Sequence, residues 1–170
     1  LEGGSNTNAL INDETYDPKA RRMNVERSSI TEDYFDTMGL RLMKGRGLRA
    51  EDGVGEIKGV VVNQALVARA WPNKEPLGEI MRANQPEKPW FVVRVVGVVE
   101  DVKQWGADAK VQPEMYTVPE GHWGNSVNLV LRSAVPLSQL APLIRRELAA
   151  MDPELALKDL RTMREVVNQS

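Results

Sequence analysis

The sequence has no cysteine, a single histidine, few aromatic residues and no long apolar run. The absence of cysteine excludes disulfides, thiol nucleophiles and cysteine-ligated metals, and it fits an oxidising or a reducing compartment equally well. No run of about 18 apolar residues is present, so no membrane-spanning helix is predicted within the chain. The formal net charge is −2. This value argues against general binding to nucleic acids or anionic membranes, because such proteins usually carry a basic stripe.

The remaining composition is that of a soluble globular protein, with 42% hydrophobic and 27% charged residues. The 170 residues suffice for one domain or two small lobes. The chain begins with Leu1 and lacks a signal-peptide pattern, so we expect it to be a piece of a longer protein. Residues 1–20 are rich in Gly, Ser, Asn and Asp and are predicted to form a loop.

Residues 30–48, ITEDYFDTMGLRLMKGRGL, predict a short helix followed by a half-buried extended edge. Thr31 is the expected N-cap, because its hydroxyl can accept a free backbone N–H of the first turn. Tyr34 and Phe35 begin a helical spacing of apolar residues, which favours one buried aromatic face. Gly39 is expected to end the helix in the left-handed conformation.

Strand and helix patterns alternate along the rest of the chain. Asn63 is the predicted N-cap of a helix over residues 64–71. The segment 90–100, WFVVRVVGVVE, is apolar on both faces except at Arg94, so it is expected at the centre of a sheet. Gly97 within it predicts a bulge or a close backbone approach. Further strands are predicted at residues 22–30, 59–62, 79–82, 115–118, 127–132 and 155–160, and further helices at residues 137–151 and after a TMRE capping box at residues 162–165.

No catalytic or metal-binding constellation can be assembled from these residues. A zinc site and a Ser-His-Asp arrangement would both need His122, which lies in a glycine-flanked loop and is interpreted as an ordinary loop residue. The glycines of residues 45–47 and 53–59 match neither G-x-G-x-x-G nor the P-loop, so they are interpreted as turns. We therefore predict no catalytic, cofactor-binding or metal-binding residues.

Several acidic and aromatic side chains are further candidates for a functional site. The carboxylates near the first helix are interpreted as cap and surface charges: Glu32, Asp33 and Asp36. Asp101 follows the central strand, where α/β proteins often place function, yet a single carboxylate favours a structural role. Core positions are expected for Trp71 and Trp90. The loop residues Trp105 and Trp123 either pack beneath their own loops, which is favoured, or form a partner surface.

Four stretches in order carry a family resemblance: ITEDYFDTMGLRLMKGRGL, VVVNQALVARAWPNKEPLGEIM, VVRVVGVVEDVKQWG, and PEMYTVP with NLVLRS and MDPELALKDLRTM. Together they resemble the MacB-like periplasmic core domain of MacB/FtsX-type ABC transporter permeases, over residues 25–170. The PEMY segment and the ending are most similar to the duplicated permeases of acidobacteria. Residues 1–20 show only thin similarity, and an earlier helix and strand of the family have no counterpart.

The resemblance implies an α+β or α/β fold with two lobes. Residues 1–30 and 126–170 would form a Porter-like α/β sandwich, and residues 31–125 an inserted Sabre-like lobe. The implied function is a non-catalytic extracytoplasmic domain without cofactors, which relays conformational change from the membrane and ATPase parts to the periplasm for efflux or partner activation.

The same resemblance implies a location on the periplasmic side of the bacterial inner membrane, within an integral membrane protein. The implied partners are the rest of the permease chain, a second permease copy, a cytoplasmic ABC ATPase, and a periplasmic adaptor or outer-membrane channel, but no nucleic acid. The residues alone leave a second hypothesis open, a free-standing soluble module that binds a small ligand or peptide. Apolar spans of about 20 residues encoded just before Leu1 and soon after Ser170 would favour the permease.

Overall fold

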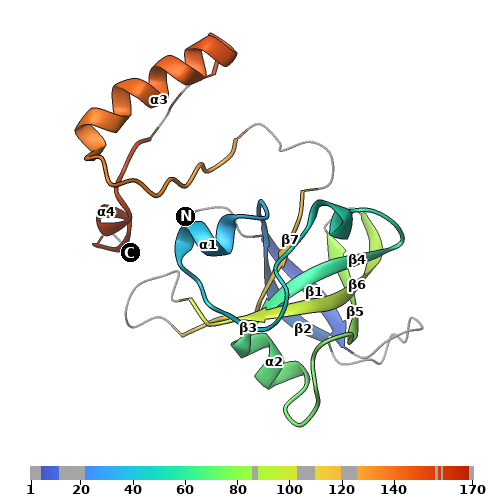
Figure 1. Cartoon of the computed structure of the whole chain (residues 1–170). Helices are drawn as coiled ribbons and strands as arrows, with labels where there is room; N and C mark the ends of the chain where they lie inside the picture. Colours follow the sequence, from blue (N-terminus) through green and yellow to red (C-terminus); the bar gives the residue numbers. More distant parts are fainter. Residues whose placement is uncertain are drawn as a thin grey trace. The chain divides into compact units, whose positions relative to one another are not determined.

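The computed structural model describes residues 5–11, 22–85, 88–102, 110–119, 126–155, 157 and 159–168. The chain divides into two compact units. The first, called the sheet unit, comprises Leu1–Lys103 and Lys110–Val130. The second, called the helical unit, comprises Gln104–Ala109 and Leu131–Ser170. The predicted mixture of helices and strands is confirmed (Figure 1).

The sheet unit holds all the strands of the described chain. Its elements are β1 (Ser5–Ile11), β2 (Arg22–Ser29), α1 (Tyr34–Met38), β3 (Leu42–Gly45), a 3-10 helix (Ala50–Gly53), β4 (Ile57–Asn63), α2 (Gln64–Ala70), β5 (Ile80–Gln85), β6 (Lys88–Val99) and β7 (Glu114–Thr117). The helical unit contains α3 (Leu137–Met151) and α4 (Met163–Asn168). Among the residues described, no helix combines the length and the apolar character needed to cross a bilayer.

The strands form one mixed sheet in the order β3-β6-β4-β7-β2-β1-β5. Strand β5 also pairs antiparallel with the first part of β6, from Ile80 opposite Arg94 to Gln85 opposite Lys88. This extra pairing closes the sheet, so that every strand except β3 has neighbours on both sides. Strand β3 lies outside the ring and pairs antiparallel with the end of β6. The pairs β4–β6 and β2–β7 are parallel.

The predicted irregularity at Gly97 is confirmed and shapes the long strand β6. Val60 lies opposite Val95, whereas the next residue, Val61, lies opposite Gly97, so one residue of β6 bulges out of the pairing. A side chain at Gly97 would collide with the backbone carbonyl oxygen of Arg46. Glycine is therefore required where β6 bends between its two antiparallel neighbours, β5 and β3.

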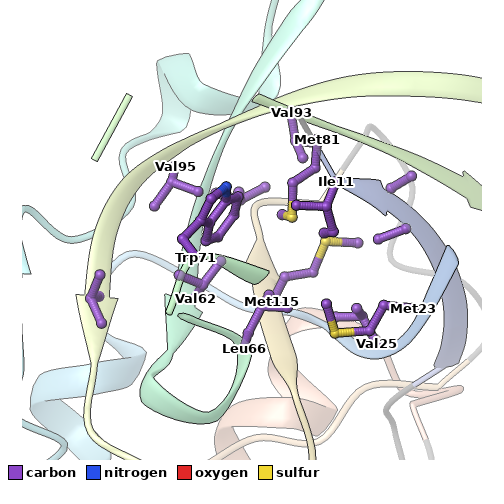
Figure 2. Close-up of a cluster of buried hydrophobic side chains, with 14 residues drawn as sticks. Ile11, Met23, Val25, Val62, Leu66, Trp71, Met81, Val93, Val95 and Met115 are labelled. Atoms are coloured by element: carbon purple, nitrogen blue, oxygen red, sulfur yellow. The ribbon is translucent and has the colours of Figure 1, made fainter. Parts of the chain in front are cut away.

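The closed sheet buries residues on both of its faces. An inner core takes side chains from every strand of the ring and is completed by Leu66 of α2 and by Trp71, which follows this helix (Figure 2). An outer core lies on the opposite face and includes Phe35 of α1. It consists of Ile30, Phe35, Leu48, Val61, Val99, Tyr116 and Val118. Because strand residues alternate between faces, this double burial explains why the central strands are apolar at successive positions.

Several predicted boundaries agree with the structure. Helix α3 occupies the predicted residues 137–151. The capping box before α4 is present, since the Thr162 N–H donates to Glu165 Oε2 at 2.7 Å and the Glu165 N–H donates to Thr162 Oγ1 at 3.3 Å. Gly39 ends α1 with φ of 72°, in the left-handed region. The predicted N-cap at Thr31 is wrong, because Asp33 precedes the first helical residue and no side chain caps the helix.

Other predictions of secondary structure are also wrong. The predicted loop at residues 1–20 contains β1, which pairs with β2 and β5. Thr7, Ala9 and Ile11 are buried at alternate positions, but four polar residues followed by three apolar ones gave no strand pattern in the sequence. The predicted strands at residues 127–132 and 155–160 do not form in the described residues of these segments. Apolar alternation alone does not make a strand, because a strand also needs a neighbour for its backbone hydrogen bonds.

Candidate functional site

Residues from three of the recognised motifs meet Ser28 of β2 in a polar cluster of the sheet unit. This cluster, here called the junction, consists of Ser28, Tyr34, Asn63, Glu114 and Tyr116. Glu114 is at its centre and is only 3% exposed. Its Oε2 accepts a hydrogen bond from the Tyr116 hydroxyl at 2.8 Å, and its Oε1 accepts one from Ser28 Oγ at 2.7 Å. A carboxylate buried to this degree needs such donors to offset its lost hydration. The junction thereby links β2 to β7.

Aromatic contacts attach α1 to the same place. The Phe35 ring meets the Tyr116 ring edge-on, with centroids 5.1 Å apart and planes at 85°. The Tyr34 ring lies 6.2 Å from that of Tyr116. Burial, reinforced by the negative charge of Glu114, raises the pKa of both phenols. Both hydroxyls therefore stay protonated at neutral pH, and the cluster holds α1 on the outer face of the sheet.

Asn63 connects α2 to β7 through one side chain that is almost fully buried. Its Oδ1 accepts hydrogen bonds from the Leu66 N–H at 2.9 Å and the Glu114 N–H at 3.0 Å. Its Nδ2 donates to the Gln112 carbonyl at 2.8 Å. The predicted N-cap role is confirmed. The second role, fixing the start of β7, depends on Glu114, a residue 51 positions away. The sequence around Asn63 therefore could not predict this role.

Asp101 lies at the predicted place, just after β6, and its role in the structure is a helix contact. Its Oδ1 accepts a hydrogen bond from the Ala65 N–H in the first turn of α2 at 2.8 Å. The side chain therefore ties the end of β6 to the start of α2, which joins the second and third motifs. This contact agrees with the structural interpretation of a single carboxylate.

The glycine-arginine segment forms a partly buried ion pair. Arg46 binds Asp52 with both arms of its guanidinium, at 2.7 Å from Nη1 to Oδ2 and 2.8 Å from Nη2 to Oδ1. The backbone N–H of Arg49 also donates to Asp52 Oδ2 at 2.8 Å. The hydrogen bond from Arg46 is the main cause of a lowered pKa at Asp52. A side chain at Gly59 would collide with the Asp52 carboxylate, so this glycine serves packing.

The remaining sequence candidates are not assembled into a site in the described structure. Glu32 accepts a hydrogen bond from the Ala50 N–H, and Asp33 and Asp36 are exposed. Trp71 is 2% exposed and belongs to the inner core, as predicted. Three candidates cannot be placed: His122, Trp105 and Trp123 lie outside the described residues, as does the side chain of Trp90.

The polar side chains described above make structural contacts between secondary-structure elements. Across the residues that the structure describes, no three or more His, Cys, Asp or Glu side chains are gathered as a metal site. Every buried polar side-chain atom in that region has a hydrogen-bond partner. Sequence reasoning missed Glu114 and Tyr116, because the predicted strand began at residue 115 and the burial of all four residues of β7 is visible only in the structure. The junction therefore joins secondary-structure elements.

The helical unit differs from this, because its apolar side chains are exposed. Among the described residues 131–155, 157 and 159–166, none is buried. The apolar face of α3 contains Leu140, Ile144 and Leu148, which are all partly exposed. Met151, at the end of this face, is 78% exposed. A surface of this kind is typical of a contact with another part of a protein.

The sequence and the fold are similar to those of known proteins. Residues 6–147 match the family described as the MacB-like periplasmic core domain. The fold is similar to the periplasmic region of MacB from Actinobacillus actinomycetemcomitans, with a TM-score of 0.61, 18% identity, and coverage of 88% of this chain and 64% of that one. It is also similar to a domain of a protein described as a permease from Porphyromonas gingivalis. That match has a TM-score of 0.54, 16% identity, and coverage of 98% of this chain and 65% of that one.

The chain therefore spans less than two thirds of the length of each of these two structures. At identities below one fifth, the likeness concerns the fold alone. A comparison with curated proteins found no match.

Proposed function

The chain belongs to the family of MacB-like periplasmic core domains, and from this premise we propose that it is a non-catalytic extracytoplasmic domain of an ABC transporter permease. The family match over residues 6–147 carries the proposal. The parent is then an integral protein of the bacterial inner membrane, with this domain on the periplasmic side. Its partners are the rest of the permease chain, a second permease copy and a cytoplasmic ABC ATPase, with a periplasmic adaptor or outer-membrane channel beyond.

In this proposal the domain relays conformational change for efflux or for activation of a partner. The construction of the sheet unit supports such a role. The closed sheet, the junction and the Arg46–Asp52 pair connect its elements by buried or partly buried contacts. An element tied down in this way opens locally only at a cost close to that of unfolding the whole unit. A force applied to one part of the sheet unit would then displace the unit as one body.

The two-lobed division is proposed in the form that the sequence predicts. Residues 1–30 and 126–170 form the Porter-like lobe, and residues 31–125 the Sabre-like lobe. Two strand pairings cross this division, because β1 hydrogen-bonds to β5 and β2 to β7. Expression of residues 31–125 alone tests the division. A cooperatively folded fragment supports it, whereas an unfolded fragment assigns β1 and β2 to the inserted part.

The exposed apolar surface of the helical unit supports contact with the rest of the permease chain. Burying an apolar side chain stabilises a protein by about 1.5–3 kcal/mol, and the described residues of the helical unit do not by themselves bury the apolar face of α3. An isolated helix of this length is only marginally stable in water. We propose that permease segments outside residues 1–170 pack on the apolar face of α3 and complete the Porter-like lobe.

Cysteine labelling tests the location, because the 170-residue chain has no cysteine of its own. Val54 is 72% exposed and Val61 is 0% exposed. In the full-length permease, freed of other reactive cysteines, Val54→Cys should react with a membrane-impermeant maleimide in intact spheroplasts. The matched control Val61→Cys should react only after denaturation. Labelling of Val54→Cys only after lysis would place the domain in the cytoplasm and contradict the proposal.

The same chemistry tests the covering of α3. Met151→Cys should react rapidly in the isolated 170-residue chain, because this side chain is exposed there. In the full-length permease its reaction should slow by at least about tenfold if other segments bury it. Val54→Cys should react at the same rate in both proteins and serves as the control. Equal rates for Met151→Cys in the two proteins would show that the rest of the permease leaves α3 uncovered.

A further inference from the structure

We draw no further inference here: the strongest candidate, the partly exposed apolar face of α3 with Leu143 and Met151 beside it, belongs to the contact with the permease chain already proposed, and nothing in the structure shows what else covers it.

Discussion

The sheet unit and the helical unit both contain apolar patterns, with opposite results. All buried hydrophobic residues of the described chain lie in the sheet unit, in its inner and outer cores. In the helical unit, the apolar face of α3 stays partly exposed. A periodic apolar pattern therefore creates an apolar surface but does not ensure that this surface is buried. A core forms where a second surface meets it and the burial exceeds the entropy lost on ordering.

Polar groups follow the same division. In the sheet unit some of them are buried and paired over long sequence distances, as with Glu114 and Ser28, which are 86 residues apart. The ion pairs of the helical unit are local and exposed, as with Arg146 and the adjacent Glu147. Exposed pairs contribute little to stability, whereas breaking a buried pair leaves an uncompensated charge. Substitutions should therefore separate the two units sharply.

The largest effect is expected for Phe35→Ala in the outer core. Phe35 is 5% exposed and packs against Tyr116, so its truncation should lower the free energy of unfolding by about 3 to 5 kcal/mol. Urea denaturation followed by tryptophan fluorescence measures this change. Val54→Ala, at an exposed position, is the control and should leave the midpoint nearly unchanged. Similar stabilities for the two variants would remove Phe35 from the core.

A smaller loss is expected for Asp52→Ala, which leaves the guanidinium of Arg46 without its carboxylate. The Arg46 side chain is 35% exposed and can partly rehydrate. The loss should therefore be about 2 kcal/mol, below that of a fully buried pair. Glu51→Ala is the matched control, because Glu51 pairs with Arg49 at the surface and should cost at most about 0.5 kcal/mol. Equal effects of the two substitutions would show that the partly buried pair does not stabilise the sheet unit.

The same carboxylate should make stability depend on pH in the acid range. The pKa of Asp52 is lowered in the folded protein from its ordinary value of 3.8. Its stabilising contribution is therefore complete above about pH 4 and is lost as the pH falls through the lower, folded value. Asp52→Asn should lower stability at neutral pH and flatten the decline below pH 4. Thermal unfolding between neutral and strongly acidic pH measures both, and parallel profiles for the two proteins would contradict the role of Asp52.

At the alkaline end the two junction phenols should act in the opposite direction. The pKa values of Tyr34 and Tyr116 are raised above 10.0 by burial, with help from the charge of Glu114. Their contribution is complete below about pH 10 and is lost as the pH rises above it, because the unfolded state then releases protons first. Phenolate absorbance should appear together with unfolding. Tyr116→Phe should weaken this coupling, and free titration of all tyrosines in the folded protein near pH 10 would contradict it.

The smallest effect is expected in the helical unit. Leu143 of α3 is 45% exposed, so Leu143→Ala should change the stability of the isolated chain by no more than about 0.5 kcal/mol. Hydrogen exchange should agree, with α3 amides exchanging far faster than those of β4. In the full-length permease the same substitution should cost more, because the proposed contact would then be present. A large loss in the isolated chain would mean that α3 already has a partner surface there.

The sequence by itself determined the features that depend on neighbouring residues, such as helix caps and helix ends. Asn63 caps α2 because a short polar side chain precedes a helical segment, and Gly39 ends α1 because glycine adopts a positive φ without strain. The apolar run of β6 predicted burial on both faces, and Gly97 predicted the close approach that the structure contains. The order of the motifs also indicated the family.

Only the tertiary structure decided which surfaces meet. The pairing of β5 with β6 closes the sheet, and it is set by a register that local periodicity does not encode. Glu114 accepts one hydrogen bond from Ser28, which is 86 residues away in the sequence. Its other donor, Tyr116, is only two residues away, but its ring is buried by residues from distant parts of the chain. The predicted strand at residues 127–132 has the right alternation but no neighbour in the described chain, so it does not form. Side-chain patterns therefore specify what a segment can bury, whereas backbone hydrogen bonds and close packing need the second surface that only the folded chain supplies.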